Sequence, residues 1–60
     1  MSEYSQWEEA VVALVAEKLE ITHSDAEGVV QAQDFYMVQS WGKGMNAEET
    51  AEKVISESTK

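Results

Sequence analysis

The sequence predicts an all-α protein, a small three-helix bundle that dimerises through its first two helices. Three observations support this prediction. No stretch alternates apolar and polar residues as a strand would, three helix-start signals occur, and seven consecutive apolar residues (AVVALVA, 10–16) cover about two helical turns. Sixty residues make one domain at most. A core of that size rarely supplies more than ~3–5 kcal/mol, so oligomerisation is an expected source of further stability.

The first helix is predicted over about residues 5–19. Ser5 and Glu8 have the spacing of a capping box, in which each side chain accepts a hydrogen bond from the other residue's amide. Advancing about 100° per residue places apolar side chains on an arc of roughly 200°, wider than a surface helix needs. The arc comprises Trp7, Ala10, Val11, Val12, Leu14, Val15 and Leu19.

The second helix is predicted over about residues 25–40, with Ser24 and Glu27 as its capping box. Phe35 and Val38 point away from its main apolar face, which contains Met37. Either this helix is central and both faces are covered within one chain, or the two side chains meet a second subunit. We predict the second arrangement because exposed apolar patches usually mark interfaces. The predicted interface consists of Val12, Val15, Phe35 and Val38.

The third helix is predicted over about residues 47–57. Asn46 is a suitable N-cap, and Glu48 and Glu49 place acids in the first turn, where they favour the helix dipole. The preceding connection contains Gly42 and Gly44, either of which can take the left-handed conformation that ends a helix.

The charge is strongly acidic, with twelve acids, four lysines and no arginine, for a net charge of −8. This charge repels nucleic acids and anionic lipids and favours basic protein partners. The predicted acidic face comprises Glu8, Glu9, Glu17, Glu48, Glu49 and Glu52. There is no cysteine and only one histidine, so we expect neither a metal nor another cofactor. The N-terminal residues are acidic where a secretory signal is basic, and no apolar run is long enough to span a membrane, so a cytoplasmic location is expected.

No catalytic constellation is recognisable, and we do not expect an enzyme. Acids are abundant, but on solvated helix faces they lack the desolvated pocket that general acid–base catalysis needs. The sequence therefore predicts a non-enzymatic protein-interaction or regulatory module, a homodimer that binds another protein. The alternative is an acidic nucleic-acid mimic that inhibits a basic nucleic-acid-binding protein.

Residues 15–29 resemble the helix-turn-helix of DNA-binding regulators. Ala16 occupies the position of the small residue on the first helix, and the packing positions are Val15, Leu19, Ile21, Ala26 and Val29. The resemblance implies a helix-turn-helix regulator, which is the second alternative. The match departs from the pattern in two ways. Glu20 stands at the turn position usually held by glycine, and the would-be recognition helix offers Asp25, Glu27, Gln31 and Asp34 instead of cations for phosphates.

Overall fold

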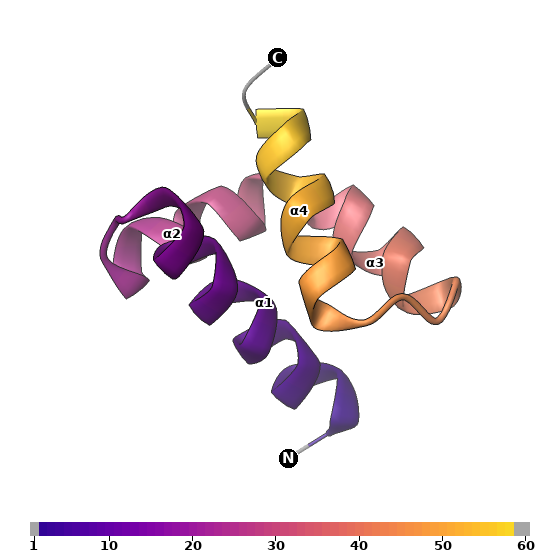
Figure 1. Ribbon diagram of the computed structural model, residues 1–60. Helices are drawn as coiled ribbons and strands as arrows, with labels where there is room; N and C mark the ends of the chain where they lie inside the picture. Colours follow the sequence, from indigo (N-terminus) through magenta and orange to yellow (C-terminus); the bar gives the residue numbers. More distant parts are fainter. Residues whose placement is uncertain (1, 59–60) are drawn as a thin grey trace.

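The computed structural model describes residues 2–58, and the only regular secondary structure in this part of the chain is α-helix, as predicted, with four helices instead of three. They are α1 (Glu3–Leu19), α2 (His23–Ala32), α3 (Asp34–Gly42) and α4 (Ala47–Ser58). Helix α1 packs against both α2 and α4, and α3 packs mainly against α4 (Figure 1). These two neighbours account for the wide apolar arc of α1, because each covers a different side of it.

Helix α1 begins earlier than the predicted capping box. Its N-cap is Ser2, whose hydroxyl oxygen accepts a hydrogen bond from the amide of Ser5 at 3.2 Å. The prediction of Ser5 as the cap was wrong because nothing in residues 3–5 opposes helix formation. The helix therefore extends to the earlier serine, which can satisfy a free amide equally well.

The turn between α1 and α2 depends on a left-handed residue. Glu20 has φ +55° and ψ +45°, and the amide of Ile21 donates to the carbonyl of Ala16 at 3.0 Å. Helix α2 then begins with Thr22 as N-cap, whose hydroxyl oxygen accepts from the amide of Asp25 at 3.1 Å. The predicted cap, Ser24, instead lies inside the helix.

The predicted helix 25–40 is broken at Gln33, which separates α2 from α3. The break is a tightened turn in which the amide of Gln33 donates to the carbonyl of Val30 at 3.0 Å. Neither proline nor glycine is present there. A straight helix from His23 to Gly42 would be about 30 Å long, whereas the molecule extends 26 Å along its longest principal axis. The break lets α2 cover α1 while α3 covers α4.

Helix α4 begins as predicted. The Oδ1 atom of Asn46 accepts from the amide of Glu49 at 2.8 Å, and Oε1 of Glu49 accepts from the amide of Asn46 at 3.2 Å. These reciprocal bonds form a capping box and satisfy two otherwise free amides.

Every helix contributes to the core. Its buried apolar residues are Val11, Val12, Val15, Ala26, Val30, Met37, Ala51 and Val54. Most of these side chains are small, and Met37 is the largest of them. None of the helices found between residues 2 and 58 combines the length and apolar character needed to cross a membrane.

Candidate protein-binding face

Helix α3 is held on both of its flanks, and these contacts fix which side faces outward. On one flank, the hydroxyl of Tyr36 donates to Oε1 of Glu57 on α4 at 3.1 Å. On the other flank, the Trp41 ring packs against Tyr4 and Trp7 of α1, with centroid distances of 5.3 and 5.1 Å. Such tilted and edge-on ring pairs add stabilisation beyond the area that they bury.

The outward side of α3 carries no charge, and its two large side chains other than Gln39 are apolar. Phe35 is 69% exposed and Val38 is 57% exposed. Gln39 and Gly42 are also exposed, and the helical repeat places all four residues within about 100° of each other, opposite Met37. We call these four residues (Phe35, Val38, Gln39 and Gly42) the α3 face.

Gly42 is the recessed part of the α3 face. A Cβ atom built at this glycine would meet no atom within 4 Å, so the space beside its main chain is open. Phe35 lies two turns earlier on nearly the same line of the helix. The face therefore presents a large aromatic ring at one end and a shallow position at the other.

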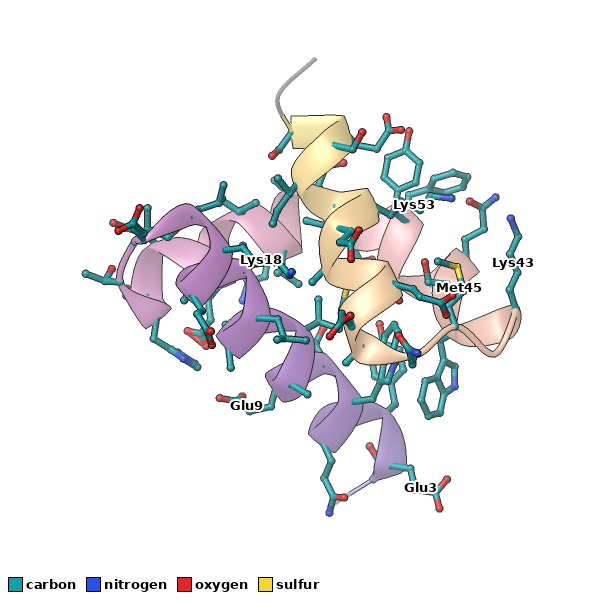
Figure 2. The ribbon with its side chains drawn as sticks, in the orientation of Figure 1. Glu3, Glu9, Lys18, Lys43, Met45 and Lys53 are labelled. Carbon is teal, nitrogen blue, oxygen red and sulfur yellow. The ribbon has the colours of Figure 1, made fainter. Side chains whose placement is uncertain are left out.

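Charged groups of both signs flank the α3 face. Asp34 lies at the N-terminal end of the helix and Lys43 at the C-terminal end. Figure 2 shows Lys43 at the outer edge of the molecule and Lys53 on α4 beside the upper part of α3. The Nζ atom of Lys53 lies 5.4 Å from the centroid of the Tyr36 ring, within the range of a cation–π contact.

Tyr4, whose ring packs against Trp7 and Trp41, is influenced by two carboxylates. Partial burial raises the pKa of Tyr4 above its ordinary value, and the carboxylates of Glu8 and Asp34 raise it further. Both causes favour the neutral phenol, because the phenolate would lose hydration and repel two negative charges.

The other two predicted interface residues lie elsewhere. Val12 is 4% exposed and Val15 is fully buried, and both belong to the core between α1 and its neighbours. Sequence reasoning placed Phe35 and Val38 on one face but passed over Gly42, which it treated only as a helix terminator. The i, i+3, i+7 spacing of Phe35, Val38 and Gly42 is the signal that identifies it.

The predicted acidic residues are spread over two helices. Glu9 and Glu17 are exposed on α1, Glu48, Glu49 and Glu52 are exposed on α4, and Glu8 is half-buried. Two of them make local contacts: Glu49 belongs to the α4 capping box, and Oε1 of Glu9 lies 3.0 Å from Nε2 of His23 on α2. Figure 2 shows Glu9 projecting from α1, away from Lys43.

Helices α1 and α2 are joined by a short turn, in which Glu20 is left-handed and Thr22 is the N-cap of α2. The acidic residues Asp25 and Glu27 are exposed on α2, and α2 contains neither lysine nor arginine. A helix of this charge brings no cation to the phosphates that supply most of the affinity for DNA.

Residues 2–58 contain no pocket and no group of three or more histidines, aspartates or glutamates placed to hold a metal ion. One buried side-chain polar atom within residues 2–58 lacks a hydrogen-bond partner, the hydroxyl of Ser40 on the inner side of α3. Comparisons with models of protein families, with curated proteins and with solved structures find no match to this chain.

Proposed function

We propose that this protein is a non-enzymatic interaction module and that the α3 face is its docking surface. The observation that carries the proposal is the exposure of Phe35 and Val38 on a helix face without charge. Burying a phenylalanine or valine side chain is worth about 1.5–3 kcal/mol. A docked protein would gain this free energy at a patch that a small monomer leaves in water.

The two flanks of α3 support the proposal because they hold the face in place before any partner arrives. Tyr36 is tied to Glu57, and Trp41 is packed against Tyr4 and Trp7. Docking on a preformed surface loses less conformational entropy than ordering a flexible one. The proposal includes the cytoplasmic location expected from the sequence, with which the lack of cysteine is compatible.

The test is a Phe35→Ser variant, because removing a side chain that is mostly in water should leave the fold intact. We expect the variant to keep its helical circular dichroism and to lose association, either with itself in light scattering or with other proteins in affinity capture. The matched control is Gln31→Ser, which changes an exposed residue on α2. Association that survives Phe35→Ser contradicts the proposal, as does equal loss in the control.

A second candidate function is capture of a basic protein by carboxylates, as an acidic mimic of nucleic acid would do. Its support is the net charge of −8 and the exposure of glutamates on both α1 and α4, which pack against each other. Binding of this kind weakens steeply as salt rises. The neutralising variant Glu48→Gln with Glu52→Gln should weaken it, whereas Phe35→Ser should not.

A further inference from the structure

We propose that the α3 face binds the α3 face of a second copy of this chain, with the two helices antiparallel. This inference rests on the proposed function and names the occupant of the docking surface. Two-fold pairs are the commonest protein assemblies, and their interfaces must be complementary to themselves. The α3 face meets that requirement in shape and in charge.

The shape argument concerns Phe35 and Gly42. When two copies of α3 lie antiparallel about an axis near Val38 and Gln39, Phe35 of one copy lies beside Gly42 of the other. The missing side chain of Gly42 leaves open space there, so the ring can rest against the main chain. The two-fold axis repeats this fit at the other end of the helix, and Val38 and Gln39 fill the middle.

The charge argument concerns the residues at the two ends of α3. Asp34 begins the helix and Lys43 follows its last residue, with no charge between them. An antiparallel pair places each aspartate at the same end of the interface as the partner's lysine and sets the two helix dipoles in opposite directions. Parallel packing would instead place like charges together.

The net charge of −8 opposes self-association in general, but the surroundings of the α3 face are less acidic than the rest of the protein. Two of the four lysines, Lys43 and Lys53, lie beside α3. Two copies that meet through α3 therefore keep the glutamates of α1 away from each other more effectively than two copies that meet through α1.

The size of the face determines how tight the dimer should be. Helix α3 has nine residues and exposes only two large apolar side chains on this face. Interfaces that bury less than about 1,200 Å² are typically weak and transient. We therefore expect a reversible dimer with a dissociation constant of the order of 100 µM, populated at high protein concentration.

The decisive variant is Gly42→Leu. Its side chain enters open space in the single chain, so the fold should be retained, and leucine has the higher helix propensity. In the antiparallel pair it occupies the place of the partner's Phe35. We expect the dissociation constant, measured by sedimentation equilibrium from about 10 µM to about 1 mM, to rise at least about tenfold. If the face instead associated through non-specific hydrophobic contacts, the dissociation constant of Gly42→Leu would fall, because the variant adds apolar surface.

A charge variant with a matched control completes the test. Lys43→Glu places two acids together at each end of the antiparallel pair and should weaken the dimer about fivefold more than Lys18→Glu does. Lys18 is an exposed residue on α1, so both variants have the same net charge. Equal effects of the two variants would overturn the antiparallel arrangement.

The outcomes also separate this inference from the proposed function. A chain that stays monomeric at about 1 mM, yet captures another protein in a manner that depends on Phe35, overturns the inference and leaves the proposed function standing. Tighter association of Gly42→Leu also overturns it. If Phe35→Ser changes neither self-association nor capture, both proposals fail.

Discussion

The indole N–H of Trp7 on α1 donates a hydrogen bond to the main-chain carbonyl of Met45, 3.1 Å away. This bond ties the segment that joins α3 to α4 onto α1, across thirty-eight positions of the chain. The same ring packs against Trp41 at the end of α3. Trp7 therefore links three elements that set the position of the α3 face.

Replacing Trp7 with phenylalanine should lower the free energy of unfolding by about 1–2 kcal/mol, because the hydrogen bond and part of the ring contact are lost. Urea denaturation followed by circular dichroism measures the change. The control is Trp41→Phe, which trims a ring in the same cluster and breaks no hydrogen bond seen in the described structure. Equal decreases in the free energy of unfolding for the two variants would contradict the role assigned to the hydrogen bond between Trp7 and Met45.

Two buried hydroxyls give opposite predictions. Ser40 and Thr50 are both fully buried, but the Thr50 hydroxyl donates to the carbonyl of Asn46 at 2.9 Å, whereas the Ser40 hydroxyl has no partner. A buried polar group without a hydrogen bond costs about 1–3 kcal/mol. Ser40→Ala should therefore raise the free energy of unfolding by about 1 kcal/mol, and Thr50→Val should lower it by a similar amount. Thermal and urea denaturation measure both changes. Destabilisation by Ser40→Ala would show that this hydroxyl has a partner in solution.

The capping patterns in the sequence predicted a helix start correctly where only one residue could serve as its N-cap. Asn46 caps α4 as expected, in reciprocal bonds with Glu49, because no other residue nearby can cap this helix. The starts of α1 and α2 were misplaced because two hydroxyl residues compete at each one, Ser2 with Ser5 and Thr22 with Ser24. The choice between them depends on where the preceding turn ends, which a capping pattern does not encode.

The outward direction of Phe35 and Val38 was predictable because it depends only on their angular relation to Met37 within the same helix. The break at Gln33 was not predictable from the chain around it. It reflects the position of α4, which a straight helix could not cover. The burial of Val12 and Val15 has the same origin, because α4 and α2 occupy the sides of α1 that the sequence left open.

The left-handed Glu20 is a strained position that substitution should relieve. The left-handed conformation destabilises the folded state by about 1–2 kcal/mol for a residue with a side chain, whereas glycine adopts it without this cost. Glycine also loses more backbone entropy on folding, which offsets part of the stabilisation expected from the substitution. Glu20→Gly should raise the free energy of unfolding by up to about 1 kcal/mol. The converse change is Gly44→Ala, since Gly44 has φ +75°. It should lower the free energy of unfolding by about 1 kcal/mol. A stability gain in both variants would contradict the argument from backbone conformation.

The environment of Tyr4 predicts a stability change in alkaline solution. Its pKa is raised by burial and by the carboxylates of Glu8 and Asp34, so the folded protein holds the phenol proton more tightly than the unfolded chain does. The stabilisation is fully present below the unfolded value of about 10 and is lost as the pH rises through the folded pKa. Tyr4→Phe should therefore show a shallower loss of stability above pH ~10 than the wild type. Tyrosinate absorbance followed against pH gives a second measurement, because the variant should lack the component that ionises late. A variant with the wild-type slope and an unchanged late component would place the raised pKa on a different group.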